Sequence, residues 1–78
     1  MRLIKVQNTL KKMNLQFEYT EIEGCGSLDF EYRGLRYHIW EFRDGEWGVE
    51  TNIRQGGKDE ELLGEYEDEI VKILGEWK

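Results

Sequence analysis

Hydrophobic positions follow a helical spacing in the first part of the chain. Residues 2–13 carry apolar side chains three or four positions apart, which places them on one face of a helix. These apolar positions are Leu3, Val6, Leu10 and Met13. Asn14 is a suitable end for such a helix, because asparagine tolerates the left-handed backbone conformation that often closes helices. The sequence therefore predicts a helix over residues 2–13.

The middle of the chain alternates between apolar and polar residues, which is typical of strands with one buried face. Glycine-containing stretches interrupt the alternation at "EGCG" (23–26), at Gly34 and at Asp44-Gly45. Connections this short favour hairpins between neighbouring strands. The sequence therefore predicts an antiparallel meander of four strands, which cover residues 15–22, 27–33, 35–42 and 46–53.

The last part of the chain returns to helical spacing. Asp59 is a suitable N-cap, and Glu60 and Glu61 suit a first helical turn. Gly64 lies inside this segment and weakens a helix by up to roughly 1 kcal/mol. One apolar stripe runs along the predicted helix: Leu62, Leu63, Tyr66, Ile70, Ile73, Leu74 and Trp77.

The predicted element order is α-β-β-β-β-α. Two amphipathic helices need an apolar surface, and one face of the sheet supplies it. We therefore expect a single α+β domain over residues 1–78, with a four-stranded antiparallel meander and both helices on one face.

Charge and cysteine content narrow the possible functions. The formal net charge is −6, yet residues 1–14 carry four bases and no acid, whereas residues 59–78 carry eight acids and two bases. One cysteine and one histidine cannot form an internal disulfide or a structural zinc site. No signal peptide or long apolar run is apparent, and a free thiol fits a reducing compartment. We expect a cytoplasmic protein without a membrane segment or a cofactor.

The third strand is apolar on both faces, which points to a partner surface. If the helices cover the face that bears Tyr37 and Ile39, the opposite and mostly polar face carries a row of candidate binding residues. These residues are Arg36, His38, Trp40 and Phe42. Aromatic and arginine side chains are enriched at binding hot spots. The alternatives are that Trp40 folds under a loop, or that the two faces of this strand are reversed.

The acidic C-terminal segment offers a second candidate surface. Rows of carboxylates can imitate a phosphate backbone and occupy a basic groove, as small phage-type inhibitors such as anti-CRISPR proteins do. Glu65, Asp68 and Glu69 are the candidate residues for this mimicry. The simpler interpretation is a solvated helix face.

Cys25 is the candidate for thiol chemistry. Pairing of residues 28–32 with 35–39 around Gly34 would place His38 near residue 29 or below it, toward the Cys25 end of the sheet. Cys25 could therefore serve in a thiol enzyme, in a redox sensor or in a disulfide-linked dimer. The simpler alternative is a structural cysteine in a turn. The acids at 44, 46 and 50 match no calcium-loop spacing, so no metal site is predicted.

The sequence resembles three groups of proteins. The element order is similar to that of the double-stranded-RNA-binding domain, but "DEELLGEYEDE" (59–69) stands where that family has phosphate-binding lysines. "GCG" (24–26) together with "YHIWEF" (37–42) and "WGVET" (47–51) resembles short uncharacterised acidic α/β proteins of anaerobic Gram-positive bacteria and their mobile elements, which implies no activity. The layout is also similar to small acidic chaperone-like domains that dimerise to bind a client.

The sequence thus favours a non-enzymatic binding module. Its expected partner is another protein or a second copy of the chain, with no direct nucleic-acid contact.

Overall fold

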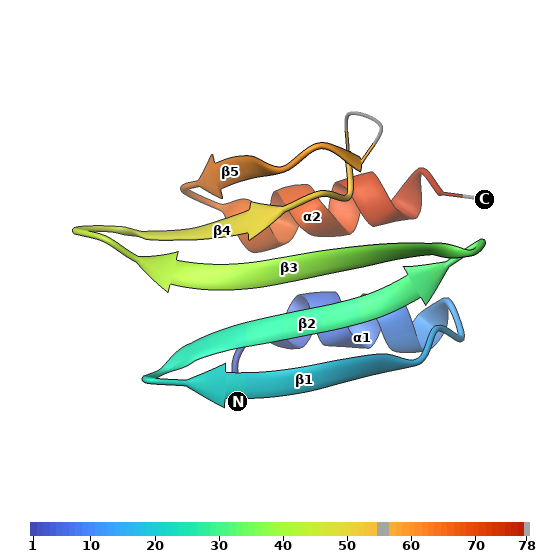
Figure 1. Ribbon diagram of the computed structural model, residues 1–78, viewed down its shortest axis with the longest axis horizontal. Helices are drawn as coiled ribbons and strands as arrows, with labels where there is room; N and C mark the ends of the chain where they lie inside the picture. The colour runs from blue at the N-terminus through green and yellow to red at the C-terminus, as the bar shows by residue number, and fades with distance from the viewer. Residues whose placement is uncertain (55–56, 78) are drawn as a thin grey trace.

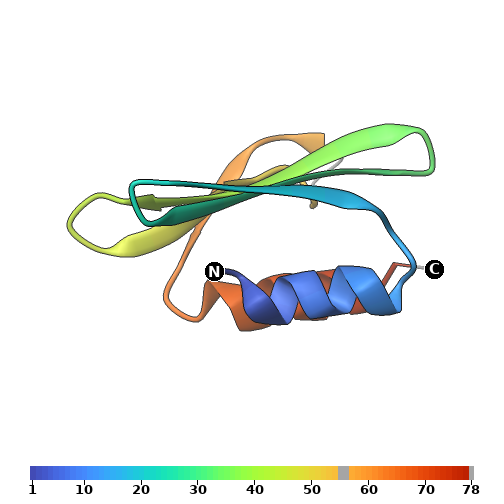
Figure 2. The ribbon, with the colours of Figure 1, turned by 90° about the horizontal axis from the view of Figure 1, so that it is seen from below.

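The protein is a two-layer α+β sandwich, seen here in a computed structural model that describes residues 1–54 and 57–77. Its sheet is antiparallel, with the strand order β1-β2-β3-β4-β5, and both helices lie on one face of it (Figures 1 and 2). This confirms the predicted class and the predicted meander. The elements are α1 (Ile4–Lys12), β1 (Phe17–Ile22), β2 (Cys25–Tyr32), β3 (Leu35–Arg43), β4 (Trp47–Thr51), β5 (Glu60–Leu63) and α2 (Tyr66–Gly75).

The prediction of four strands and of a helix beginning near Asp59 was wrong. Residues 60–63 form β5, in which Leu62 pairs with Val49 and is buried, while Leu63 points to the other face. Two adjacent leucines fit a helical stripe and a strand equally well, and the unpaired edge of β4 selects the strand. Gly64 then turns the chain into α2 with a φ of 69°, a left-handed conformation that glycine adopts without strain.

Two hairpin turns have the same backbone conformation. Glu23-Gly24 and Arg33-Gly34 each connect neighbouring strands, and all four residues have positive φ values between 53° and 82°. Positive φ at both central residues is the signature of a type I′ turn, whose twist matches that of the strands it joins. The first turn is shorter than predicted, so Cys25 is not in a connection but begins β2, paired with Ile22.

The core lies between the sheet and the helices. Most of the predicted helix-facing positions of the central strands are buried or partly buried, and the stripes of both helices pack over them. Leu35 was also predicted on this face but is 61% exposed, because it lies beside the turn at Arg33-Gly34. The pairing of Phe30 with Tyr37 places aromatic rings near Trp77, whose ring centroid lies 4.8 Å from that of Tyr37. The fully buried apolar side chains are Val6, Leu10, Leu28, Ile39, Val49, Ile70 and Leu74.

A buried carboxylate lies in this core. The side chain of Glu41 on β3 is only 2% exposed. Its Oε1 accepts hydrogen bonds from Arg2 Nε at 3.0 Å and from the Gly26 amide at 2.9 Å. Its Oε2 accepts from Arg2 Nη2 at 3.0 Å and from the Tyr66 hydroxyl at 2.6 Å. Four donors from three parts of the chain therefore compensate the cost of removing this charge from water.

Glu41 stays ionised because of these donors. Burial by itself raises the pKa of Glu41, but the hydrogen bonds from Arg2, Tyr66 and Gly26 outweigh it and hold the pKa below its ordinary value. Burial, followed by the hydrogen bond to this carboxylate, raises the pKa of Tyr66 to about 12. The network is thus a fixed arrangement of donors around a permanent negative charge at neutral pH.

A side chain of α2 caps the N-terminus of α1. Figure 1 shows α1 and α2 side by side and running in the same direction, with their N-termini at one end of the molecule. Residue Leu3 occupies the N-cap of α1 and supplies no side-chain hydrogen bond. Instead Glu67, in the first turn of α2, accepts from the backbone amides of Lys5 at 2.8 Å and Val6 at 3.3 Å. One carboxylate therefore lies near both positive helix ends.

We expect Glu67→Ala to destabilise the protein by about 1 kcal/mol, because the first amides of α1 lose their acceptor. Urea denaturation followed by circular dichroism measures this change. Glu65→Ala is the matched control, since Glu65 sits at the N-cap of α2 without making a side-chain cap. Its effect should stay within about 0.5 kcal/mol. Equal effects of the two substitutions would contradict the role of Glu67.

We expect Glu41→Gln to lower the free energy of unfolding by about 2–4 kcal/mol at neutral pH. All contacts of the Glu41 carboxylate come from donors, so an amide NH2 would face a donor and leave Arg2 without its counter-charge. Glu46→Gln, in the exposed turn before β4, is the control.

Glu41→Gln should also change how the free energy of unfolding depends on pH in acid. Because the folded pKa of Glu41 lies below its ordinary value, its contribution is present above that value and is lost as the pH falls through the folded pKa. Denaturation midpoints between pH 7 and pH 3 should therefore fall less steeply in Glu41→Gln than in the wild type. Parallel curves for the two proteins would rule out this linkage.

Candidate functional site

The row of residues predicted on β3 lies on the face opposite the helices. Figure 2 shows that both described helices lie on the other side of the sheet. Arg36 and Trp40 are exposed, with Trp40 at 40%, while His38 and Phe42 are partly buried. The faces of this strand are therefore assigned as predicted, and Trp40 is not folded under a loop.

An apolar patch occupies this face near the β4–β5 end. Phe42 pairs with Gly48 on β4, and Gly48 pairs with Leu63 on β5. A Cβ atom at Gly48 would lie 2.7 Å from Phe42 Cζ and 2.6 Å from Leu63 Cδ2, so both side chains close over the glycine. Leu63 remains 49% exposed. We call Trp40, Phe42 and Leu63 the Trp40 patch.

Neighbouring side chains hold Trp40 in place. Its ring stacks on that of His38, with centroids 4.1 Å apart and an interplanar angle of 25°. Its indole Nε1 donates to Asp29 Oδ1 at 3.3 Å. An exposed aromatic ring with a defined orientation loses little conformational entropy on binding, which favours its use as an anchor.

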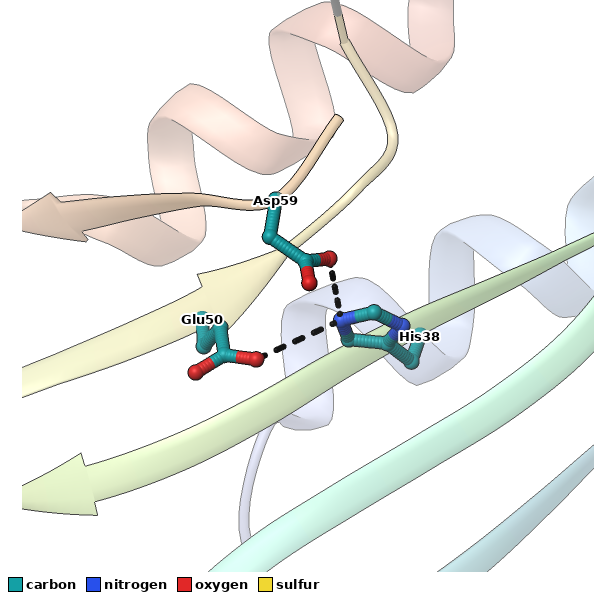
Figure 3. A group of neighbouring side chains, drawn as sticks. All are labelled: His38, Glu50 and Asp59. Atoms are coloured by element: carbon teal, nitrogen blue, oxygen red, sulfur yellow. Dashed lines mark ion pairs between the residues drawn. The ribbon is translucent and has the colours of Figure 1, made fainter. Parts of the chain in front are cut away.

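His38 is itself the centre of a polar cluster. Its backbone N–H donates to Asn52 Oδ1 at 2.9 Å, and its carbonyl accepts from Thr51 Oγ1 at 2.6 Å. The imidazole Nε2 lies 3.1 Å from Asp59 Oδ1 and 3.9 Å from Glu50 Oε2, as Figure 3 shows. The Nε2 atom is buried, and its contact with Asp59 is not aligned as a hydrogen bond.

The sheet register explains why these three side chains meet. Extending the β3–β4 and β4–β5 pairings by one residue puts positions 38, 52 and 59 in one row across the sheet. Asn52, in the middle of that row, turns its amide onto the β3 backbone, so that the side chains of His38 and Asp59 reach each other across it. Sequence reasoning missed this cluster, because it depends on β5, which was predicted as helix.

Acidic residues surround the Trp40 patch. Glu50 and Glu61 face each other across β4 and β5, beside the patch. Arg36 lies at the other end of the face, in a shallow hollow that it lines together with Glu18, Asp29 and Glu31. The open face therefore combines an apolar patch near its β4–β5 end with the acidic pair Glu50 and Glu61 beside it, and both acidic and basic side chains at its other end.

The acidic C-terminal segment is partly neutralised within the molecule. Asp68 accepts from Lys5 Nζ at 2.9 Å, and Glu69 lies 3.2 Å from Arg54 Nη1. Glu65, the remaining candidate, is exposed at the start of α2. Two of the three candidate carboxylates are therefore already paired, which leaves less free negative charge than the sequence implied.

Cys25 is a free, partly buried thiol at the start of β2. His38 lies opposite Asp29, as predicted, four positions further along that strand. Four positions correspond to roughly 13 Å along a strand, so His38 is not positioned as a base for this thiol. The structure brings His38 together with carboxylates instead.

Comparison with known proteins adds nothing to this geometry: no protein-family model, curated protein or solved structure matches the chain. Neither α1 nor α2, the helices of the described residues, is long and apolar enough to cross a membrane. The candidate site therefore rests on the arrangement of its own side chains.

Proposed function

We propose that this protein is a non-enzymatic module of the cytoplasm that binds another protein through its open sheet face. The observation that carries the proposal is the Trp40 patch, which is apolar and lies on the side of the sheet away from both described helices, with Trp40 and Leu63 exposed. Exposed apolar patches with a polar rim are a mark of interaction surfaces. The single unpaired thiol fits a reducing compartment.

The charges around the patch define the partner. Glu50 and Glu61 lie beside it, and the whole chain has a net charge of −6. A partner that presents an apolar side chain surrounded by lysine and arginine would complement both the centre and the rim. Such a complex would form faster at low salt, because the rim would attract the partner over a distance of about one Debye length.

The same charges argue against a symmetrical dimer through this face. A two-fold interface places one patch against its own copy, so the acidic rims would meet each other. Repulsion of this kind is costly when the charges are desolvated. The acidic segment of α2 is also a weaker candidate, because Asp68 and Glu69 pair with bases of the same chain.

The double substitution Trp40→Ala and Phe42→Ala should abolish capture of the partner from a lysate at low salt, while the fold stays intact. We expect at least a tenfold loss of affinity once the captured protein is purified, as is typical for hot-spot side chains. Circular dichroism should be unchanged, because the core lies on the opposite face.

Ile4→Ala is the matched control, since Ile4 is an exposed apolar residue of the helical layer. It should capture the same protein as the wild type. A partner retained equally by the double variant would contradict the proposed surface, and so would unfolding of that variant. Indifference of the complex to salt would exclude the basic partner.

A further inference from the structure

We propose that His38, Glu50 and Asp59 form a binding site for a divalent transition-metal cation of the Zn²⁺ type. The inference does not depend on the proposed partner, because the three residues belong to one chain and meet without it (Figure 3). It departs from the expectation of no metal site, which considered only acids close together in sequence.

The distances suit a metal. The three ligand atoms all lie within 4.8 Å of one another, and the Nε2 of His38 is 3.1 Å from Asp59 Oδ1 and 3.9 Å from Glu50 Oε2. Bonds of about 2.0–2.1 Å to a tetrahedral Zn²⁺ place neighbouring ligand atoms about 3.3 Å apart. A small rotation of the Glu50 side chain, which is 41% exposed, would bring its carboxylate to this spacing.

The imidazole Nε2 of His38 faces the two carboxylates. This atom is buried and has no hydrogen-bond partner among residues 1–54 and 57–77, although two carboxylates lie beside it. A buried polar atom without a partner is costly, and a metal ion on that atom would satisfy it. The ring of Trp40 stacks on the imidazole and restrains its rotation, while Asn52 and Thr51 hold the His38 backbone in the strand.

The charge balance points the same way. Glu50 faces Glu61 directly across β4 and β5, and Asp59 adds a third carboxylate at the same edge. Like charges opposite each other destabilise a sheet. Arg54, the described arginine closest in sequence, is engaged with Glu60 and Glu69 and does not neutralise them. A divalent cation would therefore remove repulsion in addition to forming bonds.

The donor set selects the class of metal. One imidazole nitrogen with two carboxylates suits Zn²⁺ and its first-row neighbours better than Mg²⁺ or Ca²⁺, which prefer oxygen ligands alone. Three protein ligands leave a fourth position for water or for a ligand from another molecule. The side chains of Asp59 and Glu50 are 60% and 41% exposed, so a cation can reach these carboxylates from solvent.

Titration calorimetry with Zn²⁺ on the untagged protein tests the site. We expect one ion per chain, with affinity reduced at least about tenfold by His38→Gln and by Asp59→Asn. Co²⁺ in place of Zn²⁺ should give visible d–d bands in the wild type that are absent from both variants. Glu18→Gln removes a carboxylate of the same face on β1, two strands from His38, and should bind like the wild type.

Several other results of the titration would contradict the proposed metal site. Absence of saturable Zn²⁺ binding would do so, and so would undiminished binding by His38→Gln or tighter binding of Mg²⁺ and Ca²⁺ than of Zn²⁺. Cys25→Ser serves as a second background, because loss of binding there would move the metal to the thiol. If His38→Gln fails to fold, Asp59→Asn decides the matter, since its exposed side chain contributes nothing to the core.

Discussion

The buried charge of Glu41 constrains the whole architecture. Its carboxylate is held by the N-terminal segment through Arg2, by β2 through Gly26 and by α2 through Tyr66. An apolar core accepts many relative placements of a helix and a sheet, whereas a buried ion is stable only where its donors converge. Glu41 therefore fixes one end of the helical layer on the sheet in a single arrangement.

Strand β3 serves two purposes at once. Its helix-facing side supplies Ile39 to the core and Glu41 to the buried network, while its other side presents His38, Trp40 and Phe42. Because successive side chains of a strand point to opposite faces, the two sets are nearly independent. The open face can therefore vary in sequence without loss of the fold, provided that the register of the sheet is kept.

How far the sequence predicts this structure depends on whether the signal is local. Alternation identified β1 to β4, and the turn at Gly34 fixed the pairing of β2 with β3, so that His38 was placed near Asp29, its partner in the structure. The connection between β1 and β2 was predicted too long, because the two-residue turn at Glu23-Gly24 was not recognised. Leu62 and Leu63 were ambiguous, because a helical stripe and a short edge strand share the same local pattern. Because residues 60–63 were predicted as helix, the proximity of His38 and Asp59 was not predicted. The donors of Glu41 were also beyond prediction, since Arg2 is 39 residues away along the chain.

The cap of α1 has a consequence for the order in which the chain acquires structure. The hairpins of the meander join neighbours in sequence and can form as soon as each pair of strands has left the ribosome. The amide of Lys5, by contrast, finds its acceptor on Glu67, 62 residues later in the chain. The cap of α1 therefore cannot form until α2 has been synthesised and lies beside it, whereas each hairpin needs only its two neighbouring strands.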